Sequence, residues 1–263
     1  MIALITDFGY TDHFVGVVKG VLKSLDPGAE VVDISHSVKS YSILNAQFIL
    51  YSSYRYFPEG TVFCVIVDPG VGTERKGLIA ADGRYFFVMP DNGIISAVIT
   101  DTMKLYHIDM APFKNASSTF HGRDVFAPVA SGLSRGTPPE RYGKPADSVV
   151  TAPFPRYTAA PESMKCGIIH IDKFGNAITS LPVNTIDFEA CSLYSVSSGR
   201  YRFKSICVRT YGDLFKGQCG IIRGSSGFIE LALSMSSIAE KHRMSIGDQL
   251  TLRPLSTTRA PAP

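Results

Sequence analysis

The 263-residue sequence contains no tryptophan, no C-x-x-C pair and no H-E-x-x-H motif. Its most glycine-rich loop, GVGTERKG at 70–77, is neither G-x-G-x-x-G nor a P-loop, because no G-K-[ST] follows. The cysteine and histidine spacings also match no zinc site. These absences leave zinc, redox and familiar phosphate-binding sites without support.

Charge is also scarce. Charged residues make up 19% of the chain, and the net charge is +3 without a basic cluster, which argues against a nucleic-acid partner. The apolar run that starts the sequence reaches Asp7, so it is too short for a signal peptide or a membrane span. An odd number of cysteines in mostly apolar stretches favours reduced thiols and a cytoplasmic location. They stand at 64, 166, 191, 207 and 219.

What the sequence does contain is an alternation of apolar runs and helical patterns in its first half. Apolar runs predict strands, and spacing of three and four residues predicts helices. Strands are expected at 2–6, 30–35 and 61–67, helices at 11–25 (capped by Thr11), 42–57, 92–100 and 124–136, and a hairpin at 77–90 turning at Asp82-Gly83. This order predicts an α/β fold with a mostly parallel sheet.

Prolines accumulate after residue 136, and short strand-like runs follow them. Such spacing is typical of a small barrel or sandwich. We therefore expect an N-terminal α/β domain, a proline-rich linker, a smaller all-β, barrel-like C-terminal domain and a disordered tail. These cover 1–150, 151–163, 164–255 and 256–263.

Acids stand at or near the ends of the expected strands. Asp7, Asp33 and Asp68 are such residues, and ligands of parallel α/β sheets bind beyond the carboxyl ends of strands. Each could equally cap a turn. Asp12 could be a helix N-terminal acid, and His121 could be structural. A metal-dependent phosphatase using these acids also stays open.

The ordered set of motifs is more specific than any one of them. ITDFGYTD, VDPGVGTER, FHGRDVFAP, DKFGNAIT and GSSGFIELA follow one another between residues 2 and 253. This set resembles the S-adenosyl-L-methionine (SAM) hydrolase family, also called SAM hydroxide adenosyltransferases, which are relatives of fluorinase and chlorinase. The resemblance implies an α/β domain followed by a β-barrel, in a homotrimer with active sites between subunits.

The resemblance also implies roles for individual residues. Asp68, Arg75 and His121 match the triad that serves the attacking water. The remaining matched positions are expected to bind substrate: Asp7 the ribose; Asp12, Asp172 and Ser225 the methionine end; and Phe174, Asn176 and Tyr211 the adenine. Tyr41 stands where the halogenases carry tryptophan. Gly224 replaces a frequent Asn and Ser226 a halogenase Arg, which leaves the contact to the methionine carboxylate open.

The expected activity is hydrolysis of SAM to adenosine and L-methionine at C5′, without a metal or cofactor. Carboxylates and aromatic faces suit the sulfonium cation, and three polar groups would orient the water. The sequence does not decide which of them is the base. A halide-dependent adenosyltransferase is the nearest alternative, although the Asp68 carboxylate would repel a halide. A SAM- or adenosine-binding sensor without turnover is another.

Overall fold

The computed structural model describes residues 1–154, 156–189 and 193–256. The chain forms two compact units, Met1–Pro153 and Phe154–Pro263. In the described part of the chain, no helix has the length and apolar character that crossing a membrane requires.

The N-terminal unit is built on a seven-stranded sheet with the order β2-β1-β3-β5-β4-β6-β7. The strands are β1 Ile2–Thr6, β2 Val31–Ser35, β3 Val62–Ile66, β4 Gly77–Ala81, β5 Phe86–Pro90, β6 Lys104–Ile108 and β7 Gly143–Pro145. Strands β2, β1, β3 and β5 pair in parallel, whereas β4, β6 and β7 pair antiparallel with their neighbours. The predicted α/β class, with a mostly parallel sheet, is confirmed.

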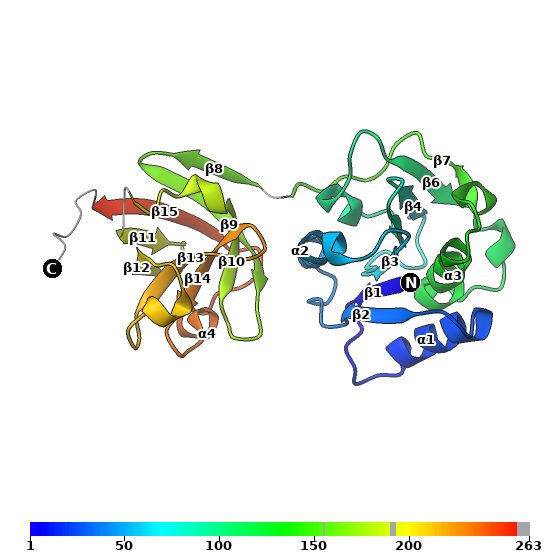
Figure 1. Ribbon diagram of the computed structural model, residues 1–263, viewed down its shortest axis with the longest axis horizontal. Helices are drawn as coiled ribbons and strands as arrows, with labels where there is room; N and C mark the ends of the chain where they lie inside the picture. The colour runs from blue at the N-terminus through cyan, green and yellow to red at the C-terminus, as the bar shows by residue number, and fades with distance from the viewer. Residues whose placement is uncertain (155, 190–192, 257–263) are drawn as a thin grey trace. The chain divides into compact units, whose positions relative to one another are not determined.

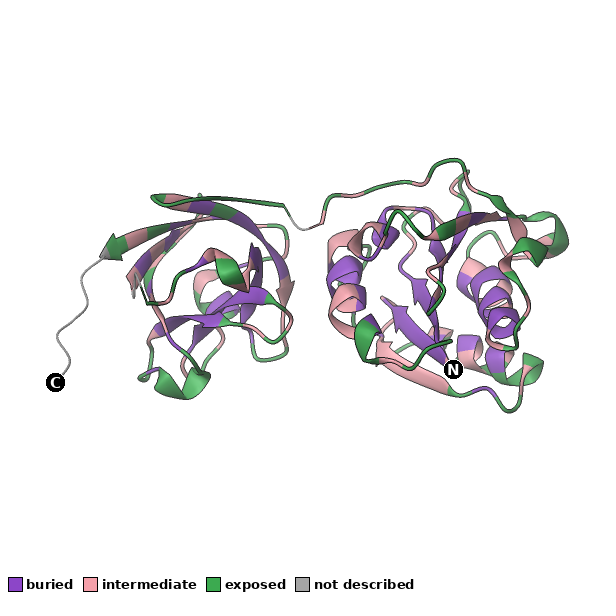
Figure 2. Ribbon diagram, turned by 45° about the horizontal axis from the view of Figure 1, so that its top comes forward, coloured by how far each residue is buried: buried purple, intermediate pink, exposed green. Residues whose placement is uncertain are grey.

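Helices cover both faces of this sheet (Figure 1). Ile2 and Leu4 of β1 pack with α1 Phe14–Leu25 and α3 Ala127–Ser134, while Ala3 and Ile5 pack with α2 Ile43–Ser53 on the other face. Figure 2 shows the central strands buried between these layers. Burial on both faces explains why the strands are apolar throughout rather than alternating.

Some helix boundaries differ from the prediction. Helix α1 begins at Phe14 after His13, so Thr11 is not its cap. The prediction of a helix at 92–100 is wrong, because only the 3₁₀ turn Ile94–Ala97 forms there. Gly93, which precedes this turn, has a positive φ of 99°. The helix expected at 124–136 forms as α3 between Ala127 and Ser134, directly after a π-turn, Gly122–Phe126.

The C-terminal unit is a closed β-barrel. Its ring runs β9-β10-β14-β13-β12-β11-β15 and returns to β9, with β8 added beside β9. The strands are β8 Tyr157–Ala160, β9 Ser163–Ile171, β10 Ala177–Pro182, β11 Leu193–Ser197, β12 Arg202–Cys207, β13 Cys219–Arg223, β14 Phe228–Leu233 and β15 Gln249–Ser256. A short helix, α4 Ile238–His242, packs against the barrel core. The expected barrel-like all-β domain is therefore present.

Three of the expectations from the sequence concern the proline-rich segment, the C-terminal tail and the cysteines. The proline-rich segment 151–163 contains strand β8. Of the tail predicted to be disordered, 256–263, only Ser256 belongs to the described residues, as the end of β15. Cys191 also lies outside them, while Cys64, Cys166, Cys207 and Cys219 are free.

Candidate active site

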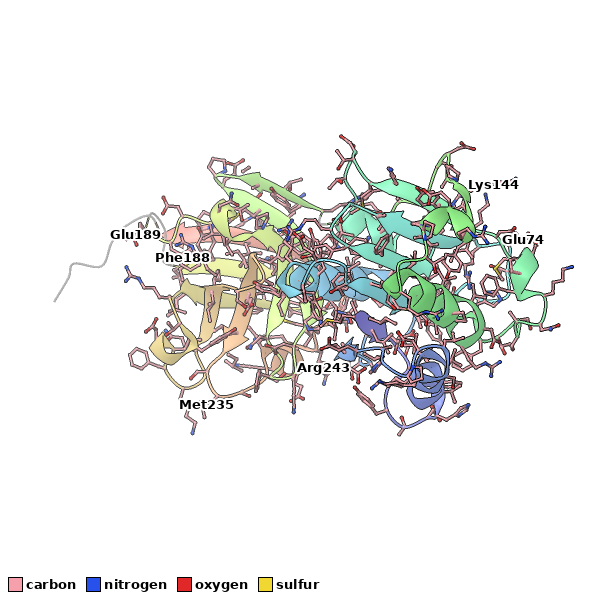
Figure 3. All side chains as sticks on the ribbon, turned by 45° about the vertical axis from the view of Figure 1, so that its right-hand side comes forward. Glu74, Lys144, Phe188, Glu189, Met235 and Arg243 are labelled. Atoms are coloured by element: carbon pink, nitrogen blue, oxygen red, sulfur yellow. The ribbon has the colours of Figure 1, made fainter. Side chains whose placement is uncertain are left out.

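The loop between β3 and β4 carries two of the predicted residues. Asp68 follows Val67 at the carboxyl end of β3, and Arg75 precedes β4. Two successive turns close the loop, through Val71 N–H to the Asp68 carbonyl (3.3 Å) and Thr73 N–H to the Gly70 carbonyl (3.1 Å). Glu74, at the edge of the unit in Figure 3, is exposed. The charged loop is thus a turn that brings Arg75 back to Asp68, the residue at which the loop begins.

Arg75 joins Asp68 and His121 into one hydrogen-bonded cluster. Its Nε donates to Asp68 Oδ1 (2.8 Å), and its Nη2 donates to Asp68 Oδ2 and to His121 Nδ1 (2.8 Å). The guanidinium also lies 5.2 Å from the centre of the Phe126 ring. The side chains of Arg75 and Asp68 are only 10% and 8% exposed, so the two charges depend on each other.

Packing against β3 brings His121 to this loop. It precedes the π-turn, where a Cβ on Gly122 would lie 3.0 Å from Ile66 Cγ2. The loop itself contacts the same segment at Gly72, whose φ is +78° and where a Cβ would lie 2.4 Å from the Ser118 carbonyl oxygen. Glycine at these positions therefore lets two distant segments approach closely.

The contact with Arg75 also determines the tautomer of His121. A guanidinium only donates, so His121 Nδ1 must be the accepting nitrogen and the proton of the neutral ring sits on Nε2. Burial, with the neighbouring Arg75 charge, lowers the pKa of His121, while the Asp68 and Asp124 carboxylates oppose that shift. The ring is a neutral donor at physiological pH.

A pocket of about 430 Å³ lies in front of this cluster. Among the predicted residues, its lining includes Asp7, Asp12, Tyr41, Asp68 and His121. Arg75 does not line it and lies behind its two partners. The triad thus consists of two groups that face the pocket and one that holds them.

An aromatic cluster that the sequence motifs had not singled out completes the pocket. Phe8, Phe14 and Phe120 line it, with ring centres 5.3–5.8 Å apart. Phe8 lies inside the motif ITDFGYTD and Phe120 beside His121, so proximity to predicted site residues was the available signal. Aromatic rings together with carboxylates form a suitable environment for a cation.

Asp7 has a structural task as well as a place in the pocket. Its Oδ2 accepts the backbone N–H of Tyr41 at 2.9 Å, and Tyr41 has a positive φ of 65° while 73% exposed. Burial raises the pKa of Asp7, and nearby Asp68 adds to this, although the Tyr41 hydrogen bond opposes it. The carboxylate therefore holds a strained residue at the pocket rim.

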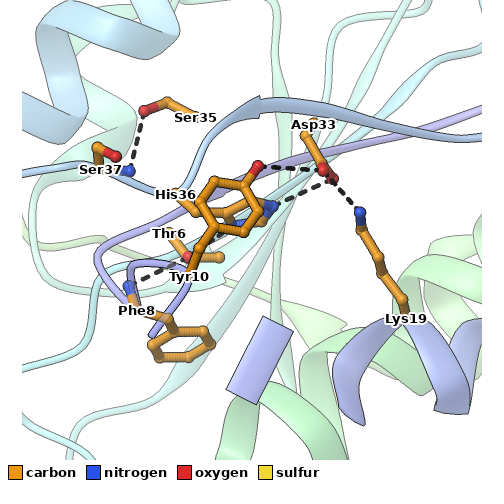
Figure 4. A network of polar contacts seen from close by, with 8 residues as sticks. All are labelled: Thr6, Phe8, Tyr10, Lys19, Asp33, Ser35, His36 and Ser37. Carbon is orange, nitrogen blue, oxygen red and sulfur yellow. Dashed lines mark hydrogen bonds and ion pairs between the residues drawn. The ribbon is translucent and has the colours of Figure 1, made fainter. Parts of the chain in front are cut away.

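A polar network supports the loop that carries Asp7 and Asp12 (Figure 4). The buried His36 contacts Thr6 Oγ1 through Nδ1 (2.8 Å), and its Nε2 lies 3.1 Å from Asp33 Oδ1 without hydrogen-bond geometry. Asp33 also accepts from Lys19 at 2.6 Å and from Tyr10 at 3.3 Å. Asp33 thus serves this network and does not line the pocket.

The C-terminal unit has a pocket of its own, of about 670 Å³. It brings together the predicted Asp172, Phe174, Asn176 and Tyr211. Phe174 is 76% exposed, Tyr211 50% and the lining residue Met235, labelled in Figure 3, 97%. Such exposed apolar side chains beside a buried amide suit a flat, partly polar ligand.

Asp172 and Ser225, both predicted to bind the methionine end of the substrate, differ from the other predicted residues in their surroundings. Both carboxylate oxygens of Asp172 accept hydrogen bonds within its own turn. Ser225 is exposed in the turn between β13 and β14 and does not line the pocket.

The Tyr211 hydroxyl donates to Glu230, a buried carboxylate that the sequence had not indicated. A Cβ on Gly224 would lie 2.2 Å from Glu230 Oε1, so glycine there leaves the room that this carboxylate occupies. Burial raises the pKa of Glu230, and Asp172 adds to the shift, although Tyr211 lowers it.

These features define a two-unit protein, α/β followed by a β-barrel, with a hydrogen-bonded Asp–Arg–His cluster at a cation-suited pocket. Within the described residues, no three His, Cys, Asp or Glu side chains are grouped so that they could hold a metal ion. The chain belongs to the SAM hydroxide adenosyltransferase family. The models of its N-terminal and C-terminal domains match residues 2–143 and 166–251.

Individual relatives agree with this assignment. The chain is 35% identical over 252 residues to the (R)-S-adenosyl-L-methionine hydrolase of Thermus thermophilus, covering 90% of this chain and 92% of the relative. A fluorinase of Actinopolyspora mzabensis is 25% identical, covering 94% and 95%. A solved structure, an uncharacterized conserved protein from Thermotoga maritima, superimposes with a TM-score of 0.88 at 34% identity, covering 96% of this chain and all of that one.

Proposed function

We propose that this protein hydrolyses S-adenosyl-L-methionine to adenosine and L-methionine by attack of water on C5′. The observation that carries this is the Asp68–Arg75–His121 cluster facing a pocket that is lined by carboxylates and phenylalanines. The relatives named (R)-S-adenosyl-L-methionine hydrolase support it and suggest the (R) epimer of the sulfonium as the substrate.

The cluster assigns different roles to its three members. Asp68 lines the pocket as a carboxylate, so it accepts a hydrogen bond from the water and takes its proton. His121 Nε2–H donates to the water oxygen, because Nδ1 is occupied by Arg75. Arg75 holds both side chains in place and is a positioning residue. Asp68 and His121 thereby hold and orient a water molecule, which is a weak nucleophile in bulk solution.

The rest of the N-terminal pocket recognises the cationic substrate. Phe8, Phe14 and Phe120 present aromatic surface, and Asp7 and Asp12 add carboxylates, which together suit a sulfonium. The sulfonium leaves as a neutral thioether, so the departing group needs neither a general acid nor a Lewis acid. We therefore propose that the reaction proceeds without a metal or cofactor.

Asp68 favours water over a halide. Two unit negative charges about 4 Å apart repel each other by ~4 kcal/mol at an effective dielectric of about 20. A halide would also have to lose its hydration shell in a partly buried pocket. The positively charged Arg75 reduces this repulsion but does not face the pocket.

We also propose that the protein assembles as a homotrimer in which the N-terminal unit of one subunit and the C-terminal unit of the next share a substrate. Each unit supplies a pocket with part of the expected contacts. The N-terminal pocket would hold the attacking water and the sulfonium cation, and the C-terminal pocket offers aromatic faces and an amide. The free, buried thiols of Cys64 and Cys166, whose pKa burial raises to about 12, support a reducing, cytoplasmic location.

The direct test is incubation with each sulfonium epimer of SAM in heavy-oxygen water. Chromatography and mass spectrometry should show equal amounts of adenosine and methionine, with the heavy atom in adenosine. Parallel reactions contain a chelator, chloride or fluoride. Unlabelled adenosine, a 5′-halogenated nucleoside as the main product, or loss of activity with the chelator would each contradict the proposed reaction.

A further inference from the structure

The outer face of the barrel carries four cationic side chains, Lys165, Arg202, Lys204 and Arg253, all of them exposed. No described residue forms an ion pair or a hydrogen bond with any of these four side chains. The strands concerned follow one another round the barrel as β12, β11, β15, β9 and β8 (Figure 1). The four charges are therefore free to meet a partner.

The register of these strands arranges the cations in two rows. Each row has one or two hydroxyl side chains between two cations, and one row has a further hydroxyl at its end. The first row is Lys204, Ser195 and Arg253, and the second is Arg202, Ser197, Thr251, Lys165 and Thr158. Since neighbouring strands lie about 4.8 Å apart, the two cations of a row stand roughly 10 Å apart in the first and roughly 14 Å apart in the second.

Alternation along the strands directs both rows outward. Val196, Phe203 and Leu252 stand between members of the two rows along β11, β12 and β15, and they are buried in the barrel core or packed against it. Because the cations are spread between residues 165 and 253, the sequence contains no basic cluster, and the strand register alone brings them together. The expectation of no nucleic-acid partner depended on that missing cluster.

Acids are scarce around the two rows. Glu162 is exposed in the turn between β8 and β9, and Asp248, just before β15, is already paired with Arg200. The C-terminal unit contains 13 lysines and arginines and 8 acids, whereas the N-terminal unit contains 13 and 15. Charge asymmetry of this kind between the halves of a chain favours a polyanionic partner.

We propose that these two rows form a binding face for the backbone of double-stranded RNA. Lysine and arginine bind phosphate oxygens, and serine and threonine hydroxyls bind phosphates and sugars. A-form RNA has a wide, shallow minor groove that displays 2′-hydroxyl groups, with phosphates along its two edges. The order of cation, hydroxyl and cation in each row matches the order of phosphate, ribose hydroxyl and phosphate across that groove. Such contacts carry no base sequence.

The same face suits other polyanions less well. Neither row contains an aromatic side chain, so the unpaired bases of a single strand would find no ring to stack on. The minor groove of B-form DNA is only about 6 Å wide, and DNA has no 2′-hydroxyl group. The outside of a closed barrel is convex, so a flat lipid surface would meet only part of the two rows.

The experiment measures binding of the full chain to a fluorescently labelled RNA duplex of about 20 base pairs, by anisotropy at several salt concentrations. Four phosphate contacts predict that the logarithm of the affinity falls against the logarithm of the salt concentration with a slope of roughly −3 to −4. Lys204→Glu with Arg253→Glu should weaken binding by about tenfold or more and make the slope shallower by about 2. Lys204→Gln with Arg253→Gln should show the same shift in slope without introducing acids.

The matched control is Lys216→Glu with Lys241→Glu, which changes the net charge of the same unit equally. Both residues are exposed and lie outside the two rows. This variant should keep nearly the parental affinity for the RNA duplex. Equal weakening in both pairs of variants, at melting temperatures equal to that of the parent, would reduce the effect to overall charge and overturn the proposal.

Three further probes decide the nature of the partner. A DNA duplex and a single-stranded RNA of the same sequence, and vesicles containing phosphatidylserine, should each bind more weakly than the RNA duplex. Tighter binding to any of them, or no binding to the RNA duplex at low salt, would contradict the proposal. Light scattering should give one mass for the parent and the row variants, since a lower mass in the variants would make this face a contact between copies of the chain instead.

Discussion

Asp68 meets two demands that conflict. It must be ionised to accept a proton, yet its side chain is only 8% exposed, and burial disfavours charge. The Arg75 guanidinium, which contacts both of its oxygens, makes the charge tolerable there. The same contact constrains how this residue can be tested, because removing the carboxylate entirely would leave Arg75 buried and unpaired.

For this reason Asp68→Asn is the informative variant. The amide oxygen still accepts from Arg75, but the side chain no longer accepts a proton from water. We expect kcat to fall by roughly 10²- to 10⁴-fold, the range for general acid–base groups, with little change in SAM affinity by calorimetry. Asp26→Asn, at an exposed turn where Oδ1 accepts Gly28 N–H at 3.0 Å, is the matched control. A near-parental rate for Asp68→Asn would reduce Asp68 to a turn-capping residue.

The lowered pKa of His121 predicts the acid side of the rate profile. The ring must be neutral to accept from Arg75, and burial and Arg75 depress its pKa. The neutral form therefore persists below the ordinary value of about 6.5, and kcat should fall only as pH drops further, through the depressed pKa. Steady-state rates between roughly pH 4 and 8 measure this.

His121→Asn keeps a neutral donor that does not titrate, so it should lose this acid limb while retaining a lower rate. Asp7→Asn tests the competing explanation, since burial also raises the pKa of Asp7. If the limb disappeared with Asp7→Asn and persisted in His121→Asn, the titrating group would be Asp7.

At the scale of elements, the β3–β4 loop is positioned by the segment before the π-turn. Gly72 makes this contact, with a positive φ and no room for a Cβ beside the Ser118 carbonyl. Gly72→Ala should destabilise the fold by roughly 1–3 kcal/mol and lower kcat, because Asp68 and Arg75 would move away from His121. Thermal unfolding and steady-state kinetics measure the two effects.

Gly83→Ala separates them. Gly83 has a similar φ of +88°, but nothing lies within 4 Å of a Cβ there. It should therefore show the conformational cost without loss of kcat. Equal losses of kcat in both alanine variants would mean that the loop contact does not position the site.

Local patterns predicted most of the fold because they repeat over many residues. The β4–β5 hairpin turns at Asp82-Gly83 as expected, since Asp82 Oδ1 accepts the N–H groups of Arg84 and Tyr85. The segment 92–100 was misjudged because a short apolar run suits both a helix and a buried irregular segment. Its conformation is decided by distant contacts, such as Asn92 Nδ2 to the Val67 carbonyl at 2.9 Å.

The candidate site shows more strongly that local sequence patterns do not determine contacts between distant residues. Predicted residues line both pockets, although Ser225 lines neither, and the motifs do not give the direction in which a side chain points. That Arg75 lies behind Asp68, and that Asp172 faces inward to its turn, follows from three-dimensional contacts. Glu230 lies within the motif GSSGFIELA but had no signal of its own, since a single acid in an apolar strand resembles any surface-facing position.

At the scale of the whole molecule, the trimer proposal predicts complementation between damaged subunits. Asp68→Asn damages the N-terminal pocket, and Asn176→Ala damages the C-terminal one. Each alone damages every site, whereas a mixed trimer contains some undamaged pairs. Mixing the two under exchange conditions should therefore restore partial activity. Light scattering should give the mass of three chains.

Exchange itself must be demonstrated, for instance with subunits carrying different tags. The double variant carrying both changes in one chain is the control, and mixing it with itself should restore nothing. Proven exchange without recovery would place the complete site within a single chain.

Tyr41 combines backbone strain with solvent exposure at the rim of the N-terminal pocket. A bulky side chain at a positive φ is strained, and this one is mostly solvent-exposed, so it contributes little packing. Tyr41→Gly should therefore raise the free energy of unfolding by up to about 1 kcal/mol, and should raise the melting temperature slightly. Tyr56→Gly should lower it, because Tyr56 is equally exposed but is not among the positive-φ residues. If glycine folds better at this position, tyrosine there lowers the durability of the fold, and a gain in substrate binding would have to offset that loss.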